Sequence, residues 1–138
     1  MDLSVIIPCL NEKDTIGICV TKALKQIKNN NIKGEVIVAD NGSHDNSIQI
    51  ALDKGARVIN ARRKGYGYAI QEGIKEAKGK YILMADADDS YDFNKVNEFF
   101  QKINQGYGLV NGCRLPAGGG SIEKRAMPLS HRYIGNPF

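Results

Sequence analysis

The sequence predicts an α/β fold, an open and mostly parallel sheet with helices on both faces. Short runs of apolar and β-branched residues alternate along the chain with stretches of helical spacing. Strands joined by helical crossovers of about a dozen residues lie parallel, with right-handed connections. The 138 residues are the size of one domain. We therefore expect a single sheet and a single core.

The first strand and helix follow from residues 3–31. The run Leu3-Ser4-Val5-Ile6-Ile7 is nearly all apolar or β-branched, which is typical of a strand buried on both faces of a parallel sheet. Pro8 is expected to end it. Asp14 is a candidate N-cap for a helix whose apolar spacing continues to the turn at residues 29–31.

The same alternation continues through the rest of the chain. Strands are expected at residues 35–39, 57–60 and 81–85, and helices at residues 45–54 and 68–77. Glycines follow both of these helices and are expected to stop them. A fourth helix is indicated by Val96, Phe99, Phe100 and Ile103, and a short fifth strand by Leu109-Val110.

The composition excludes several classes of protein. Hydrophobic residues make up 42% and charged residues 25%, which is ordinary for a globular protein. The apolar runs are far shorter than the roughly 18 residues needed to cross a bilayer, so we expect no membrane span or signal segment. Three cysteines without Cys-x-x-Cys spacing indicate neither a disulfide framework nor a zinc site. A cytoplasmic location is the resulting expectation.

Positive charge is concentrated near the carboxyl terminus. Residues 113–138 contain Arg114, Lys124, Arg125 and Arg132 against Glu123, whereas residues 1–112 balance 15 basic against 14 acidic side chains. The balanced part argues against a nucleic-acid surface. The basic segment indicates either one local anionic contact or a solvated tail.

Polar residues collect where the predicted strands end. Ligands of open parallel sheets bind beyond the carboxyl ends of the strands. The four polar segments found there are Pro8-Cys9-Leu10-Asn11-Glu12, Asp40-Asn41-Gly42-Ser43-His44-Asp45, Ala61-Arg62-Arg63-Lys64-Gly65-Tyr66-Gly67 and Asp86-Ala87-Asp88-Asp89. Three acidic clusters and one basic loop are thus expected to share one edge of the sheet.

Asp86, Asp88 and Asp89 are three carboxylates within four residues. Such close like charges repel one another unless a cation neutralises them. Oxygen ligands suit Mg²⁺ or Mn²⁺, which takes one or two carboxylates and completes its shell with water and substrate phosphates. The cluster therefore predicts a metal-bridged diphosphate. The alternative is an acidic turn that caps the next helix, together with Asp92 and Asn94.

Asp40 and Lys64 are candidate ligand contacts on the neighbouring segments. Asp40 ends a strand where a carboxylate can accept hydrogen bonds from a ribose or a base, whereas Asp45 is better explained as a helix N-cap. Lys64 precedes Gly65 in a loop whose backbone can approach a phosphate closely. A surface turn accounts for Lys64 equally well. The sequence lacks a P-loop, a nucleophile elbow and a complete dinucleotide fingerprint.

The chain resembles the inverting family 2 glycosyltransferases of the GT-A fold, specifically their dolichyl-phosphate hexose synthase-like branch. The matching segments are Ser4-Val5-Ile6-Ile7-Pro8 with Asn11-Glu12, Val38-Ala39-Asp40-Asn41-Gly42-Ser43 with Asp45, Lys64-Gly65-Tyr66-Gly67-Tyr68-Ala69, and Asp86-Ala87-Asp88. Residues 110–114 and 127–137 also look like that branch, so the resemblance covers essentially the whole chain.

This resemblance implies a set of site residues. The donor-binding residues would be Pro8, Asn11, Glu12, Asp40, Lys64, Gly65 and Asp86. Asp86 and Asp88 match the family's Asp-x-Asp motif, which grips the ribose and a divalent cation, Mg²⁺ or Mn²⁺, with Asp89 as a candidate further ligand. Arg114 and Arg132 match basic positions that would face an acceptor phosphate, and with Asp88 they would be the catalytic residues.

The implied reaction moves a hexose from UDP- or GDP-hexose to a polyprenyl phosphate at the cytoplasmic face of the membrane. Residues 1–112 would form the nucleotide-sugar-binding domain, and residues 113–138 a basic acceptor-side segment that continues it and contacts the membrane surface. Members of the branch continue further, so the chain resembles an amino-terminal part, whose open sheet edge would favour self-association. Two alternatives stay open, a sugar-1-phosphate nucleotidyltransferase and a non-catalytic nucleotide-sugar-binding module.

Overall fold

A four-stranded parallel sheet organises the part of the chain that the structure, a computed structural model, describes, residues 1–112. The strands are β1 (Leu3–Cys9), β2 (Gly34–Asp40), β3 (Arg57–Asn60) and β4 (Tyr81–Met84), in the spatial order β3-β2-β1-β4. All three strand pairs are parallel, and β3 and β4 are the outer strands. The chain divides into two compact units, residues 1–108 and residues 109–138, and the whole sheet belongs to the first.

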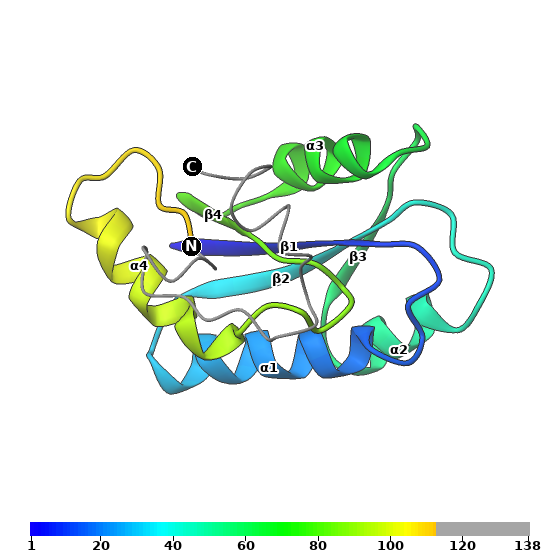
Figure 1. The fold of residues 1–138 in the computed structure, drawn as a ribbon, viewed down its shortest axis with the longest axis horizontal. Coiled ribbons are helices and arrows are strands. Elements are labelled where there is room, and N and C mark those ends of the chain that lie inside the picture. The colour runs from blue at the N-terminus through cyan, green and yellow to red at the C-terminus, as the bar shows by residue number, and fades with distance from the viewer. Residues whose placement is uncertain (113–138) are drawn as a thin grey trace, which may run out of the picture. The chain divides into compact units, whose positions relative to one another are not determined.

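Helices cover both faces of this sheet (Figure 1). The helices are α1 (Ile16–Asn29), α2 (Ser47–Asp53), α3 (Tyr66–Glu76) and α4 (Val96–Asn104), with a short 3₁₀ turn at Phe93–Lys95. α3 packs alone on one face, and α1, α2 and α4 pack on the other (Figure 1). The predicted fold class is confirmed. Within residues 1–112, no helix combines the length and apolar character needed to span a bilayer.

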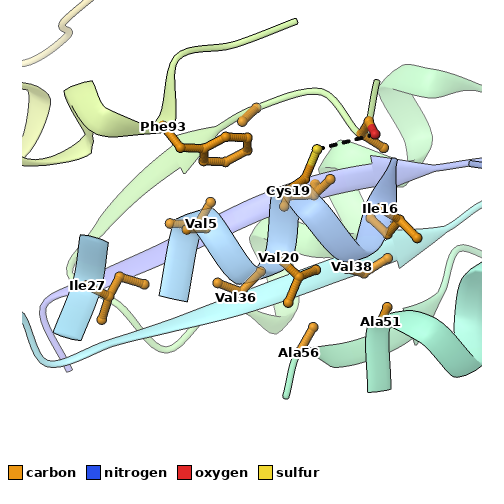
Figure 2. Close-up of a cluster of buried hydrophobic side chains, with 14 of the residues drawn as sticks. Val5, Ile16, Cys19, Val20, Ile27, Val36, Val38, Ala51, Ala56 and Phe93 are labelled. Carbon is orange, nitrogen blue, oxygen red and sulfur yellow. Dashed lines mark hydrogen bonds between the residues drawn. The ribbon is translucent and has the colours of Figure 1, made fainter. Parts of the chain in front are cut away.

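The larger part of the core lies between the sheet and α1 (Figure 2). Successive side chains of a strand point to opposite faces, so Val5 and Ile7 of β1 pack against Val20 of α1, and all three are completely buried. Ile6 points to the other face, toward α3. There Gly73 allows a close approach, because a Cβ at this position would lie 2.5 Å from a methyl carbon of Ile6.

Pro8 lies inside β1 and does not end it, contrary to the sequence prediction. Neighbouring residues of a parallel strand bond alternately to the two flanking strands. The Cys9 carbonyl accepts the Asn41 amide beyond β2, while the Ile6 carbonyl accepts the Ala85 amide just beyond β4. The backbone nitrogen of Pro8, which carries no hydrogen, therefore faces the β4 side of β1. Because β4 has already ended at this level, the proline removes no hydrogen bond between the strands.

Two other sequence predictions about elements were wrong. Asp14 is not the N-cap of α1, because the helix begins at Ile16 after Thr15, and both of these amides donate to the Glu12 carbonyl. The expected strand at Leu109-Val110 is absent from the described residues. The apolar run consists of Leu109 and Val110 alone, between Gly108 and residues 111–112. Two residues are too few to form a strand without a neighbouring strand to pair with.

Candidate functional site

A cleft of about 270 Å³ lies at the carboxyl edge of the sheet. From β1 the chain first builds outward through β2 and β3, and then crosses through α3 to place β4 on the opposite side of β1. The strand order reverses at this point, where α/β sheets bind their ligands. The cleft is lined by Pro8, Cys9, Leu10, Glu12, Asn41, Tyr66, Ala69, Asp86, Ala87 and Asp88.

Four of the sequence-predicted site residues line this cleft, namely Pro8, Glu12, Asp86 and Asp88. They come from the carboxyl end of β1 and the segments after β1 and β4, the two strands at the reversal point. The other predicted residues within residues 1–112 lie beside the cleft, at the end of β2 or in the loops, and two of them, Asn11 and Asp40, accept hydrogen bonds from backbone amides. Arg114 and Arg132 lie outside the described residues.

Asn11 joins the loop after β1 to the loop after β2. Its backbone amide donates to Ser43 Oγ at 2.9 Å, and its side-chain oxygen accepts the His44 amide at 2.8 Å. Its φ of 57° is in the left-handed region that asparagine tolerates better than most residues. Next to it, the Glu12 amide donates to Ser47 Oγ at 2.8 Å. Asn11 is therefore not among the cleft-lining residues, but it holds together the two loops that follow β1 and β2.

Asp40 closes its own turn. Its carboxylate accepts the Gly42 amide at 2.9 Å and the Ser43 amide at 3.1 Å, and only 3% of the residue is exposed. Asp45 has a similar role before α2, where it accepts the Ser47 amide at 2.9 Å. The sequence interpretation of Asp45 as the helix N-cap is nevertheless wrong by one residue, because the N-cap of α2 is Asn46 and Asp45 precedes it. Donor binding by Asp40 stays a prediction.

Asn41 is a site residue that the sequence interpretation missed. It is buried, its side-chain amide donates to the Arg63 carbonyl at 2.7 Å, and its side-chain oxygen accepts the Gly65 amide at 2.6 Å. These two bonds fix the basic loop to the end of β2. The available signal was an asparagine directly after a buried strand at the ligand-binding edge.

Lys64 lies over the turn that Asp40 closes. A Cβ built on Gly42 would come within 2.7 Å of Lys64 Nζ, and Gly42 has a φ of 98°. Glycine is therefore favoured at position 42 by its backbone conformation, whereas the flexible Lys64 side chain could move away from a Cβ. Next to Lys64, the Arg63 guanidinium stacks over the Tyr68 ring at 5.3 Å.

Asp86 is held by α3. The Tyr66 hydroxyl donates to Asp86 Oδ1 at 2.6 Å. This hydrogen bond, with partial burial and the carboxylate charge, raises the pKa of Tyr66 to about 12. The phenol therefore remains a donor to Asp86 at neutral pH. Tyr66 was not predicted as a site residue, although it stands in the glycine-bearing loop that the sequence analysis singled out.

The other two carboxylates of the acidic loop face different surroundings. Asp88 lines the cleft and is exposed, and its Oδ1 accepts the Ser90 amide at 2.9 Å. Asp89 instead pairs with α1, where Lys22 Nζ lies 2.8 Å from each of its carboxylate oxygens. Two of the three carboxylates thus face the cleft together, and the third is engaged elsewhere.

The pair Asp86 and Asp88 fits a hard divalent cation. Residues 1–112 contain no group of three or more His, Cys, Asp or Glu side chains that could hold a metal ion. Mg²⁺, however, is commonly bound by only one or two carboxylates, with water and substrate phosphates as its other ligands. Two oxygen donors at the mouth of an open cleft therefore meet the requirement for a cation that arrives with a phosphate ligand.

The fold and the cleft define a class, α/β proteins that bind a ligand at the reversal point of a parallel sheet. Within this class, residues 4–136 match the family model described as glycosyl transferase family 2. The chain belongs to glycosyl transferase family 2.

Three curated relatives indicate its neighbourhood in the family. A low-salt glycan biosynthesis hexosyltransferase of Haloferax volcanii is 38% identical over 99% of this chain and 32% of its own length. A dolichyl-phosphate hexose transferase of the same organism is 32% identical over 89% of this chain and 52% of its own length. Protein RfbJ of Shigella flexneri is 33% identical over 85% of this chain and 88% of its own length. The chain thus spans a third to a half of the first two relatives.

Solved structures share the fold. A mycobacterial protein matches with a TM-score of 0.68 at 26% identity, over 78% of this chain and 38% of its own. Glucosyl-3-phosphoglycerate synthase from Mycobacterium tuberculosis, in complex with Mn²⁺, UDP-glucose and phosphoglyceric acid, matches with a TM-score of 0.55 at 26% identity, over 62% of this chain and 33% of its own.

Proposed function

We propose that this chain forms the donor-binding part of an inverting hexosyltransferase that uses a nucleoside-diphosphate sugar, UDP- or GDP-hexose. The observation that carries the proposal is the pair Asp86 and Asp88, which line the cleft at the sheet's reversal point in a family 2 chain. The related glucosyl-3-phosphoglycerate synthase, whose structure holds Mn²⁺ and UDP-glucose, supports the donor class.

Asp86 and Asp88 would hold Mg²⁺ or Mn²⁺, which would neutralise charge on the departing diphosphate. Tyr66 orients one of the two carboxylates through its hydroxyl. Pro8, near the end of β1, and Glu12, in the loop that follows, line the cleft and would contact the nucleoside. Lys64, in the loop that Asn41 anchors, would lie toward the donor as a mobile positive charge.

The proposed acceptor is a polyprenyl phosphate at the cytoplasmic face of the membrane. The Haloferax volcanii relative named as a dolichyl-phosphate hexose transferase supports an acceptor of this kind. A phosphate is already ionised near neutral pH, so its oxygen can attack the anomeric carbon without a general base. Arg114 and Arg132 would bind this anion through charge-assisted hydrogen bonds.

Calorimetry with Mn²⁺ and either UDP or GDP tests the proposal. We expect one of the two nucleotides to bind only when the metal is present, and the Asp88→Ala variant to lose this binding. Because Asp88 is exposed, its removal should leave the melting temperature nearly unchanged. The matched control is Asp53→Ala, which removes an exposed carboxylate at the end of α2 and should bind like the wild type.

Two outcomes would contradict the proposal. If the folded wild-type chain binds neither UDP nor GDP in the presence of metal, the proposed donor site is wrong. Release of pyrophosphate from a nucleoside triphosphate and a sugar phosphate would assign the cleft to nucleotidyl transfer instead.

A further inference from the structure

The acidic loop after β4 is fastened to α1 at two points. Lys22 Nζ lies 2.8 Å from both carboxylate oxygens of Asp89. One turn earlier in the same helix, the Cys19 thiol donates to the Ala87 carbonyl at 3.3 Å (Figure 2). Residues three positions apart lie on the same side of a helix. The two contacts therefore grip consecutive parts of one loop.

The two fastened residues are those that do not supply the cleft's carboxylates. Ala87 is buried against the core with only 4% exposed, and the Asp89 side chain is 27% exposed at its contact with Lys22. Asp86 and Asp88 alternate with them along the chain and line the cleft, to which the buried Ala87 also contributes. The loop thus contacts α1 through the Ala87 carbonyl and the Asp89 carboxylate, and presents its other two carboxylates to the cleft.

The backbone at Asp89 shows why the loop needs this grip. Its φ of 59° lies in the left-handed region, which aspartate adopts more readily than most residues but which still has a conformational cost. The doubly hydrogen-bonded ammonium group of Lys22 supplies an interaction that holds Asp89 in this conformation.

Cys19 contributes from inside the core. It is completely buried among apolar side chains, and this burial raises the pKa of its thiol, so the sulfur keeps its proton. The protonated thiol can donate to the Ala87 carbonyl, which the surrounding core shields from water. This contact is weaker than the ion pair, because sulfur is a poor hydrogen-bond donor.

We propose that Lys22 is a positioning residue for the donor site: its ion pair with Asp89 selects the loop conformation that points Asp86 and Asp88 into the cleft. This inference deepens the proposed function, and it assigns Asp89 to the support of the site instead of to the cation. The Lys22 side chain is 49% exposed, and exposed ion pairs of this kind typically change an equilibrium by about fivefold at most.

The test compares Lys22→Met with Lys25→Met in the 138-residue chain. Both variants remove one exposed lysine charge from α1 and keep an unbranched side chain, but only Lys22 pairs with Asp89. Amide hydrogen exchange without metal or nucleotide reports the loop itself. We expect Lys22→Met to speed exchange across residues 86–91 while the melting temperature stays within a few degrees of the control.

Binding provides the second measurement. In the presence of Mn²⁺, Lys22→Met should weaken affinity for the nucleoside diphosphate measurably, by about two- to fivefold, whereas Lys25→Met should not. Lys22→Arg should retain affinity. The charge-swapped double variant Lys22→Asp with Asp89→Lys should recover much of it, which a loss of general stability could not explain.

The outcomes separate this inference from the proposed function. If the wild type binds and Lys22→Met matches it in both exchange and affinity, the positioning role is wrong and the donor site stands. If the wild type binds no nucleotide, the donor proposal fails. If, in addition, amide exchange of residues 86–91 is unchanged in Lys22→Met, the positioning role of Lys22 fails as well. Equal losses in Lys22→Met and Lys25→Met would also overturn it.

Discussion

Tyr66 and Asp86 both line the cleft and are joined by one short hydrogen bond, 2.6 Å from the phenolic oxygen to Oδ1. The bond links the first turn of α3 to the loop after β4. A hydroxyl donor and a carboxylate acceptor at this distance form a charge-assisted contact. It therefore helps to orient a proposed metal ligand.

The first prediction concerns the ionisation of Tyr66. Because Asp86 raises its pKa to about 12, one tyrosine should ionise well above the ordinary value of about 10. The associated stabilisation is complete below about pH 10 and disappears as the pH rises through about 12. Absorbance of the phenolate during an alkaline titration would show this step, and Asp86→Asn should lower it.

The control for this titration is Tyr107→Phe, which removes an exposed tyrosine after α4. It should leave the late step in place, whereas Tyr66→Phe should abolish it. A late step that persists in Tyr66→Phe would contradict the assignment.

The second prediction concerns Asn41. Asn41→Ala removes both hydrogen bonds that hold the basic loop and leaves the Gly65 amide and the Arg63 carbonyl without these partners. We expect a loss of about 1–3 kcal/mol in the free energy of unfolding, measured by urea denaturation. Asn29→Ala, at an exposed position at the end of α1, should change it little. Equal losses of unfolding free energy in Asn41→Ala and Asn29→Ala would contradict the structural role of Asn41.

The third prediction compares two glycines of α3. Alanine in place of glycine ordinarily stabilises a helix by up to about 1 kcal/mol. Gly67 has open space around it, so Gly67→Ala should be neutral or stabilising. Gly73→Ala should instead destabilise by about 1–3 kcal/mol, because its Cβ would meet Ile6 at 2.5 Å. Thermal unfolding of the two variants should therefore shift in opposite directions or differ clearly in size.

The fourth prediction concerns acid stability. Burial alone would raise the pKa of Glu35, but hydrogen bonds from the Lys78 amide, Arg57 and the Ser4 hydroxyl outweigh it and lower the pKa. The carboxylate therefore contributes stability above the pKa of an unfolded glutamate, about 4.3, and loses it as the pH falls through the lower folded value.

Urea midpoints measured between about pH 3 and pH 7 check this contribution. The wild type should lose stability toward acid more steeply than Glu35→Gln, which cannot titrate. Glu98→Gln, an exposed partner of Lys95 on α4, should follow the wild-type curve. A Glu35→Gln curve parallel to the wild type would contradict the prediction.

The fold followed from the sequence because burial on both faces leaves a clear pattern. Central strands such as residues 3–9 and 34–40 have continuous apolar runs, residues 5–7 and 36–39, and crossover helices show apolar residues on one side. Asp86 and Asp88 could be predicted to face a ligand because parallel strands bring their carboxyl ends to one edge. Such reasoning needs only topology.

The contacts that support the site could not be predicted in this way. Asn41 acts through backbone groups of a loop that is distant in sequence, and Lys22 acts through Asp89 from a helix that precedes it by more than half of the described chain. Lys22 has the appearance of any solvated helix lysine until the packing of α1 under the acidic loop is known. Pro8 was misjudged because its effect depends on where the neighbouring strand stops.

The position of β4 beside β1 has a consequence for biosynthesis. β1 is made first, yet one of its two partners begins only at Tyr81. On the ribosome, the edge of β1 that later pairs with β4 therefore stays unpaired until residues 81–84 have been made. Until residues 86–89 have also been made, the segment after β1 lacks the acidic loop beside it. The proposed donor site would therefore be complete only after Asp86 and Asp88 have been synthesised, so a bound donor would not assist the folding of β1 and β2 before that point.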